Sequence, residues 1–120
     1  MPHGKQVLDD LRDPARKLRA AIPDVYAGFA ATHKAALVDG ALDTRTKELI
    51  ALAIGIEQKC DGCIASHARG AARAGATPEE AAEAIGVAIL MAGGPSTVYG
   101  PRAYDAFLEF HEQYASRAEG

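Results

Sequence analysis

The sequence has no tract of basic residues and no apolar run long enough to span a bilayer without charges. We also expect no secretory leader, because the first residues run into a charged, amphipathic segment. Its 13 Lys and Arg residues are scattered along the chain, and the formal net charge is −3. A chain that lacks clustered positive charge is poorly suited to a nucleic-acid surface. We therefore expect a cytoplasmic protein that binds neither nucleic acid nor membrane.

The sequence also lacks convincing runs of alternating apolar and polar residues bounded by turns, which are typical of β-strands. Alanine is the commonest residue, and it favours helices and disfavours strands. Of the 120 residues, 48% are apolar, so the chain can bury a core without a disulfide to staple it. We expect one all-α domain that spans residues 1–120.

Apolar spacing and turn residues divide the chain into about six helical segments. The first, Gln6 to Ala21, contains Pro14, which should kink or split it because proline cannot donate a backbone hydrogen bond. The other helices are expected from Pro23 to Asp39-Gly40, from near Asp43-Thr44 to the region of Cys60, from there to Ala74, from Thr77 to Gly93, and over about Thr97 to Arg117.

Capping residues mark several of these boundaries. Asp61 is a suitable N-cap for the fourth helix, and Gly75 suits the left-handed position just after its end. Thr77, Pro78 and Glu80 form the clearest start signal, with a capping threonine, proline at the first helical position and glutamate at the third.

Both cysteines of the chain lie in the run Cys60-Asp61-Gly62-Cys63, and His67 follows one helical turn later. In the cytoplasm such a pair is more often redox-active or metal-binding than structural. On a helix, Cα atoms at this spacing lie about 5 Å apart, which a disulfide accepts. His67 shares the face of Cys63 but lies about 10 Å along the axis from Cys60. We therefore expect His67 to act on Cys63, at a helix N-terminus that stabilises a thiolate.

Glu48 is the remaining candidate, at the entry to the apolar run Leu49–Ile56 of the preceding helix. It is either an exposed acid near a helix N-terminus or, if the two helices meet at a bend, a partner that orients the imidazole of His67. Glu48, Cys60, Cys63 and His67 could also supply four zinc ligands. Structural zinc sites usually use two separated ligand pairs, and no second pair follows here.

The spacing of Glu48, Cys60-x-x-Cys63 and His67 resembles the active-site pattern of the AhpD-like alkylhydroperoxidases, in the carboxymuconolactone decarboxylase superfamily. The resemblance is best over about residues 40–95. It implies an all-α fold of helical hairpins that assembles as a homo-oligomer, a trimer or hexamer. It also implies a thiol peroxidase that needs no haem, flavin or metal cofactor. The flanking segments that share the resemblance are Leu42–Ala53 and Gly75–Glu80.

The resemblance also implies roles for the four residues. Cys63 would attack the hydroperoxide, Cys60 would resolve the oxidised thiol, His67 would act as the base, and Glu48 would end the proton relay. A dithiol donor, such as a lipoyl protein or a thioredoxin-like protein, would reduce the resulting disulfide. Gly62 is the one departure, because family peroxidases often carry histidine or an aromatic residue just before the second cysteine. This position bears on efficiency and substrate preference.

Two other classes of function remain open. In the first, the protein is a non-redox lyase or isomerase that uses His67 as a general base, with the cysteines incidental. In the second, it is a binding or assembly module whose cysteine pair is a redox switch or a weak metal site. The other histidines, His3, His33 and His111, have no cysteine or acid at useful spacing apart from Glu112 beside His111. We interpret them as surface or interface residues.

Overall fold

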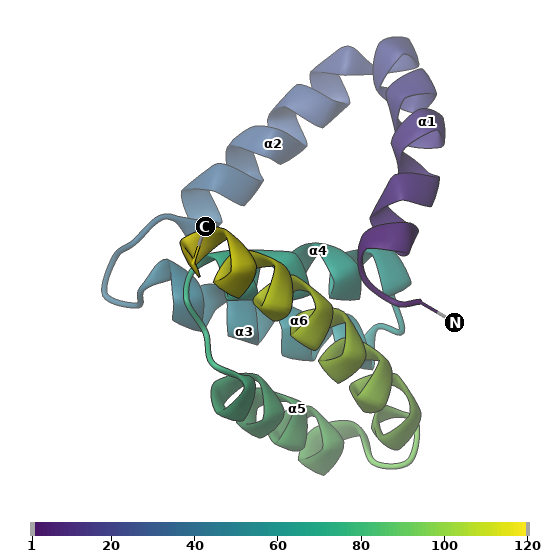
Figure 1. Ribbon diagram of the computed structural model, residues 1–120. Coiled ribbons are helices and arrows are strands. Elements are labelled where there is room, and N and C mark those ends of the chain that lie inside the picture. Colours follow the sequence, from purple (N-terminus) through teal and green to yellow (C-terminus); the bar gives the residue numbers. More distant parts are fainter. Residues whose placement is uncertain (1, 120) are drawn as a thin grey trace.

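The computed structural model describes residues 2–119, which form six α-helices and no strand. This confirms the predicted all-α fold class and the number of helices. The order of the helices can be followed along the colours of Figure 1. Their bounds are α1 Lys5–Ala21, α2 Pro23–Leu37, α3 Thr44–Glu57, α4 Asp61–Arg73, α5 Pro78–Ala92 and α6 Ser96–Glu119.

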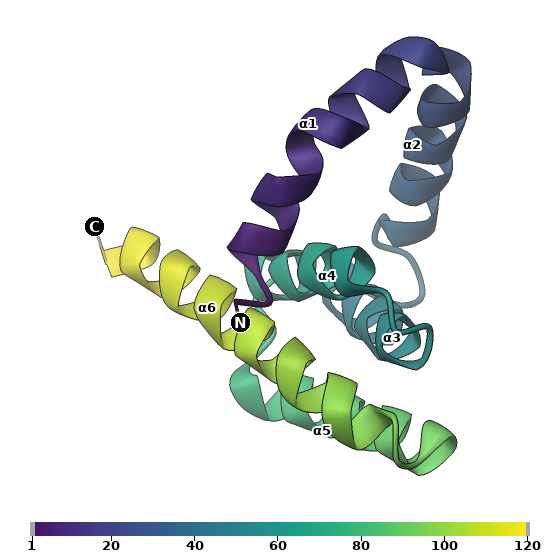
Figure 2. The ribbon, with the colours of Figure 1, turned by 90° about the vertical axis from the view of Figure 1, so that its right-hand side faces the viewer.

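The helices form a packed body, made of α3 to α6, and an arm made of α1 and α2. The two views at right angles show the arm as a hairpin that rises from the body on the side of α4 (Figures 1 and 2). No residue of α1 or α2 is buried. The base of the arm is held by the backbone N–H of Lys5, which donates to Oε1 of Glu109 on α6 at 2.9 Å.

The core lies where α4 packs between α3 and α6. One face of α4 is a row of buried alanines that includes Ala68 and Ala71, and their small side chains let neighbouring helices approach closely. Phe107 on α6 is fully buried, and its burial stabilises the fold by about 1.5–3 kcal/mol relative to an exposed ring. The other large side chains of the core are Leu52 and Ile56 on α3, Ile64 on α4, Ile85 on α5 and Phe110 on α6.

The predicted caps around the loop between α4 and α5 are confirmed, and α3 begins with a further cap at its predicted start. Asp43 accepts a hydrogen bond from the backbone N–H of Thr46 at 2.8 Å. Thr77 and Glu80 form both hydrogen bonds of a capping box at the start of α5. Gly75 has a φ of 93°, the left-handed conformation that glycine adopts without a steric penalty.

The expected cap of α4 was wrong. Cys60, not Asp61, caps α4, and Asp61 is the first helical residue, because the sulfur takes the position of the capping acceptor. Of the two effects expected of Pro14, a kink or a split, the split does not occur, since α1 continues from Lys5 to Ala21 across it. Proline removes one backbone donor there, and the helical hydrogen bonds on either side of it are retained.

None of the helices within residues 2–119 combines the length and the apolar character needed to cross a membrane.

Candidate active site

The candidate site begins at the turn between α3 and α4. Beyond the end of α3 at Glu57, Lys59 adopts a φ of 54°, and the backbone N–H of Cys60 then donates to the carbonyl of Gly55 at 3.1 Å. This turn ends one helix and starts the next, so α4 packs directly against α3. The predicted division into two helices near Cys60 is confirmed.

Cys60 and Cys63 are joined by a disulfide, and their Cα atoms lie 5.2 Å apart. The Sγ atom of Cys60 also accepts a hydrogen bond from the backbone N–H of Cys63 at 3.2 Å. Cys63 is exposed and Cys60 is half-buried. The sulfur of Cys60 therefore lies among the unpaired N–H groups at the start of α4, where negative charge on sulfur is stabilised.

A pocket of about 370 Å³ opens beside the disulfide. Both cysteines and His67 line it, and α3 contributes Ala51, Ile54 and Gly55. The two helices approach closely at Gly55, where a Cβ atom would lie 3.4 Å from Cβ of Cys63, at van der Waals contact. The pocket thus brings the two thiols and the imidazole to one surface, with an apolar wall opposite.

Glu48 and His67 are direct partners. Oε1 of Glu48 lies 2.6 Å from Nδ1 of His67, and the Glu48 residue is only 6% exposed. The interpretation of Glu48 as an exposed acid is therefore wrong. A buried carboxylate needs a donor, so Nδ1–H donates to Glu48 and the lone pair of Nε2 remains available on the other edge of the ring. This is the arrangement of an oriented general base.

Gly70 makes room for the Glu48 carboxylate. A Cβ atom at Gly70 would overlap the Glu48 side chain at its carboxyl carbon and both oxygens. Gly70 is buried on α4, one turn beyond His67, so α4 supplies both the imidazole that Glu48 binds and the space that its carboxylate occupies.

His33 was not predicted to belong to this site. Its ring, from α2, stacks on the ring of His67 with a centroid separation of 5.8 Å and an interplanar angle of 16°. His33 is exposed, as a surface residue should be, but it also covers one face of the candidate base. With Glu48 it lines a second pocket, of about 720 Å³, between α2, α3 and α4. No spacing rule within one helix could have indicated this contact, because the loop between α2 and α3 sets it.

Gly62, the departure from the family pattern, faces the arm. A Cβ atom at this position would lie 3.0 Å from Cδ1 of Leu11 on α1. A larger side chain would therefore press on the end of the Leu11 side chain, so glycine at this position leaves room for the arm beside the cysteines.

The zinc alternative gains no support from this geometry. Within residues 2–119, no group of three or more His, Cys, Asp or Glu side chains is arranged to hold a metal ion. In this state the two cysteine sulfurs are bonded to each other.

A family model described as the carboxymuconolactone decarboxylase family matches residues 23–106. The chain belongs to this family. The predicted superfamily is confirmed. Among carboxymuconolactone decarboxylase family structures, a protein from Legionella pneumophila is 42% identical and superposes with a TM-score of 0.82, covering 86% of this chain and 92% of that one. A putative carboxymuconolactone decarboxylase from Burkholderia xenovorans is 23% identical with a TM-score of 0.77, over 84% of this chain and 80% of that one, and shows a likeness of fold.

The curated proteins that are similar to this chain have names that state no activity. An uncharacterized protein from Cupriavidus necator is 39% identical over 90 residues, which are 75% of this chain and 80% of that protein. A protein from Paracoccus denitrificans, described as uncharacterized protein 4 in the cox locus, is 45% identical over 75 residues, which are 62% of this chain and 68% of that protein. The reaction must therefore be argued from the site.

Proposed function

We propose that this protein is a thiol-dependent peroxidase that reduces alkyl hydroperoxides through the Cys60–Cys63 pair. The observation that carries the proposal is the Glu48–His67 hydrogen bond of 2.6 Å, beside a pocket that both cysteines and His67 line. Such a site can hold a thiolate, move its proton and store two electrons as a disulfide. Membership of the carboxymuconolactone decarboxylase family is compatible with this chemistry.

The cycle begins with the reduced pair. His67 takes the thiol proton of Cys63 at Nε2, and the Glu48 carboxylate stabilises the imidazolium through Nδ1–H. The Cys63 thiolate then attacks one oxygen of the hydroperoxide. The O–O bond breaks, Cys63 becomes a sulfenic acid, and the departing alkoxide takes the proton from His67 and leaves as an alcohol.

Cys60 resolves this intermediate. Its thiolate attacks the sulfenic sulfur of Cys63, the S–O bond breaks, and hydroxide leaves and is protonated to water. The N–H of Cys63, which contacts the Cys60 sulfur at 3.2 Å, supports the thiolate form of this residue. The Cα separation of 5.2 Å allows the disulfide to form without moving the helix.

An external dithiol completes the cycle. Its thiolate attacks Cys63, which is the exposed sulfur, and Cys60 leaves as a thiolate at the helix N-terminus. The second thiol of the donor then releases Cys63 and carries away the disulfide. A lipoyl protein or a thioredoxin-like protein has the required paired thiols. Because the cycle needs a steady supply of reductant, the proposal includes a cytoplasmic location.

The first experiment is stoichiometric oxidation of the reduced, metal-free protein. An organic hydroperoxide is added, samples are quenched with an alkylating agent at timed points, and intact mass reports the free thiols. Peroxidase chemistry predicts that both alkylation sites disappear together as the intramolecular disulfide forms. If both cysteines stay fully alkylated after long exposure, the thiols are not the reactive centre and the proposal fails.

A lyase or isomerase reaction is the second candidate, because the Glu48–His67 pair is an oriented base that needs no thiol. The two candidates separate cleanly in a variant with both cysteines replaced by serine. A lyase retains its turnover in that variant, whereas a peroxidase loses all of it.

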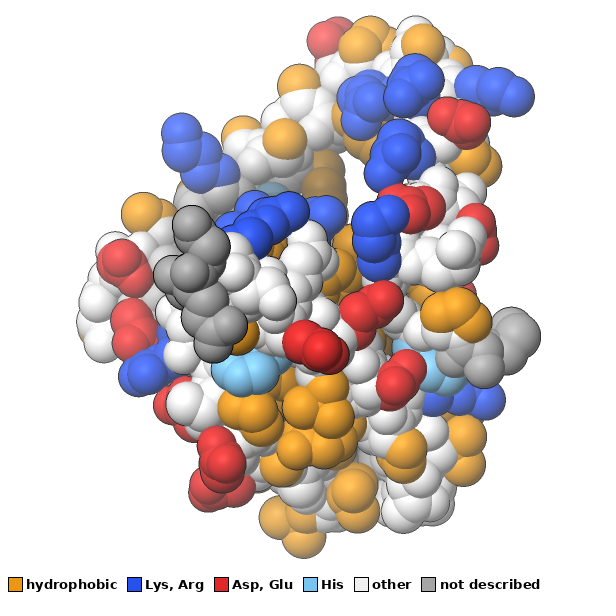
Figure 3. Space-filling view, in the orientation of Figure 1, with side chains coloured by type: hydrophobic (Ala, Val, Ile, Leu, Met, Phe, Trp, Pro, Cys, Tyr) orange, Lys and Arg blue, Asp and Glu red, His pale blue; other side chains and the backbone are white. Residues whose placement is uncertain are grey.

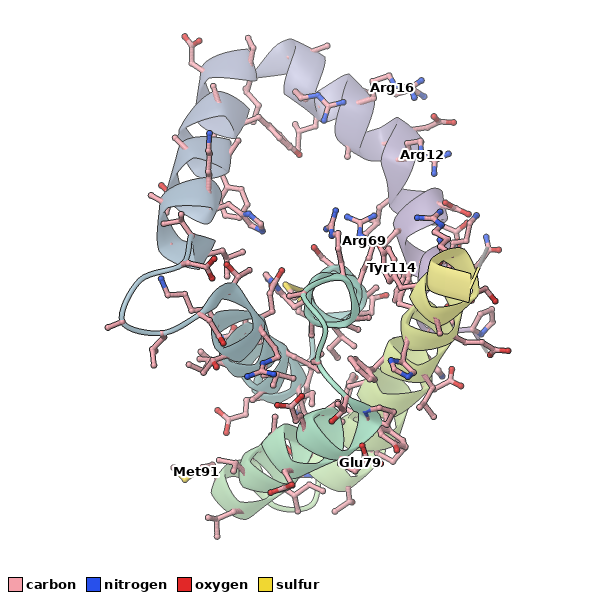
Figure 4. All side chains as sticks on the ribbon, turned by 60° about the vertical axis from the view of Figure 1, so that its left-hand side comes forward. Arg12, Arg16, Arg69, Glu79, Met91 and Tyr114 are labelled. Carbon is pink, nitrogen blue, oxygen red and sulfur yellow. A yellow bond between two sulfur atoms is a disulfide. The ribbon has the colours of Figure 1, made fainter. Side chains whose placement is uncertain are left out.

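We also propose that the protein acts as a homo-oligomer, a trimer or hexamer, as its resemblance implies. Large apolar side chains are exposed on the arm and on α5, among them Phe29 at 68%, Leu90 at 79% and Met91 at 72%. Met91 points away from the other helices (Figure 4), and a gap separates part of the arm from the body (Figure 3). A second copy of the chain would cover these surfaces.

Native mass spectrometry or sedimentation tests the assembly. Leu90→Gln combined with Met91→Gln should lower the assembly mass, whereas Glu79→Gln, an exposed change on the same helix, should leave it unchanged. A wild-type protein that stays monomeric at micromolar concentration would refute this part of the proposal.

A further inference from the structure

We propose that His33 is a positioning residue for His67, and that its charge regulates how readily His67 accepts a proton. This inference rests on the proposed base role of His67 and concerns the regulation of that site. It starts from the stacked pair of rings, 5.8 Å apart and 16° from parallel, that joins the arm to the site.

Two contacts hold the His67 ring, one at its edge and one at its face. Glu48 binds its Nδ1 edge at 2.6 Å, which fixes the edge but leaves rotation about the hydrogen bond. The His33 ring covers the face and limits that rotation. Phe29, one turn earlier on α2, packs against His33 at a centroid separation of 6.2 Å and supports it from behind. Together the two contacts fix the orientation of the imidazole ring, and with it the direction of the Nε2 lone pair.

The same stacking makes the charge of His33 matter. When His67 takes a proton, its ring becomes a cation against the face of His33. A neutral ring stabilises a stacked cation, whereas a second imidazolium repels it. A charge on His33 would therefore lower the readiness of His67 to accept a proton.

Other charged groups surround the same pocket but do not produce this change. They come from α2, the following loop, α3 and α4, and the Lys and Arg side chains are balanced by carboxylates. Of the residues that line this pocket, His33 is the one whose ring stacks on that of His67. These groups are Lys34, Asp39, Asp43, Arg45, Glu48 and Arg73.

The test measures the rate of Cys63 alkylation by iodoacetamide from pH 5 to 9, in a Cys60→Ser background in which Cys63 is the sole cysteine. His33→Phe keeps a ring but cannot be charged. It should react within about twofold of the parent at pH 8, and its rate should fall less steeply as the pH is lowered from there. His33→Ala loses the ring and should react about two- to tenfold more slowly at pH 8.

The matched control is His111→Phe. His111 also stacks on an aromatic ring, that of Phe107, at 5.7 Å and 18°, but lies on α6 and lines neither pocket of the site. Its profile should match that of the parent, and far-UV circular dichroism should show an unchanged helix content for all variants. If the His33 variants also match the parent at every pH, or if His33→Phe is as slow as His33→Ala at pH 8, the proposal is overturned.

His67→Ala separates this inference from the proposed function. If its alkylation rate equals that of the parent at every pH, His67 is not the base and both proposals fail. If His67→Ala is slow while the His33 variants react normally, only the role of His33 is refuted. The assay contains no hydroperoxide, so a protein without peroxidase turnover still gives a clear answer.

Discussion

Gly70 of α4 and Glu48 of α3 use the same space: the carboxylate lies where a side chain at position 70 would begin. The carboxylate is buried, and its hydrogen-bond partner His67 lies one turn earlier on α4. Two residues of α4 therefore fix the position of Glu48: His67 donates a hydrogen bond to its carboxylate, and Gly70 leaves the space that the carboxylate occupies.

We predict that Gly70→Ala damages both stability and reactivity. The new methyl group must displace a charged side chain, so the variant should be destabilised by about 1–3 kcal/mol. His67 would also lose its oriented partner, and Cys63 alkylation near pH 7 should slow. Gly86→Ala is the control, because nothing lies within 4 Å of a Cβ atom there. That change in an open helix position should stabilise by about 0.5–1 kcal/mol. Urea unfolding measures both.

The overlap can be tested directly by removing the carboxylate. In a Glu48→Ala background the space beside Gly70 is empty, so Gly70→Ala should cost much less stability than in the wild type. Non-additivity of about 0.5–3 kcal/mol is typical of residues in contact. If the two changes are additive within error in urea unfolding, Gly70 is not retained for Glu48.

The two cysteines should behave differently when each is replaced by serine. Cys63→Ser removes the attacking thiol and should abolish peroxide turnover. Cys60→Ser should consume one equivalent of hydroperoxide and then stop, leaving a sulfenic acid on Cys63 that dimedone traps and intact mass detects. If Cys63→Ser gives the trapped adduct and Cys60→Ser does not react, the roles of the two residues are reversed.

A large side chain at position 62 should disturb the contact between α4 and the arm. Gly62→Phe places a ring against Leu11, whose Cδ1 lies 3.0 Å from the site of the first new carbon. We expect the midpoint of thermal unfolding to fall, with α1 more open to limited proteolysis at its start. Leu11→Ala alone should have a small effect, because Leu11 is 46% exposed. In the Gly62→Phe background, Leu11→Ala should restore most of the lost thermal stability. If the double variant is destabilised by the sum of the two single effects, the contact between these residues is contradicted.

Much of this structure could be predicted from local sequence. Thr77, Pro78 and Glu80 specify a capping box whichever helices surround it, and Gly75 is placed by the need for a left-handed residue after α4. The cysteine pair and His67 follow one another within two turns, so helical geometry alone predicts that they are neighbours. These predictions needed only residues close together in the chain.

The remaining features depend on how the helices pack. Glu48 faces His67 only because the chain turns at Lys59 and returns α4 along α3, a direction that periodicity does not specify. His33 is further removed, since the loop after α2 sets its position and its own helix has no buried residue to orient it. The role of Gly70 could not be predicted from the sequence. A glycine within an alanine-rich helix has no distinguishing pattern, and its role depends on the Glu48 side chain that packs against it in the folded structure.

Asp43 provides a prediction for the pH dependence of stability. The hydrogen bonds from Thr46, and after them the charge of Arg45, hold the pKa of this capping carboxylate below its usual value of 3.8. A carboxyl whose pKa is lower in the folded protein contributes stability above its unfolded pKa and loses it as the pH falls through the folded value. The contribution of the Asp43 charge should therefore be constant from pH 7 to about 4 and decline below that.

The Asp43→Asn variant isolates this effect, because asparagine keeps an acceptor for the N–H of Thr46 but carries no charge. Other carboxylates titrate equally in both proteins, so the difference between their midpoints of thermal unfolding reports Asp43 alone. We expect the wild type to be the more stable at neutral pH and the difference to shrink as the pH is lowered from 4 towards 2. A difference that stays constant throughout that interval would mean that Asp43 caps α3 by hydrogen bonding only, with no contribution from its charge beside the helix N-terminus.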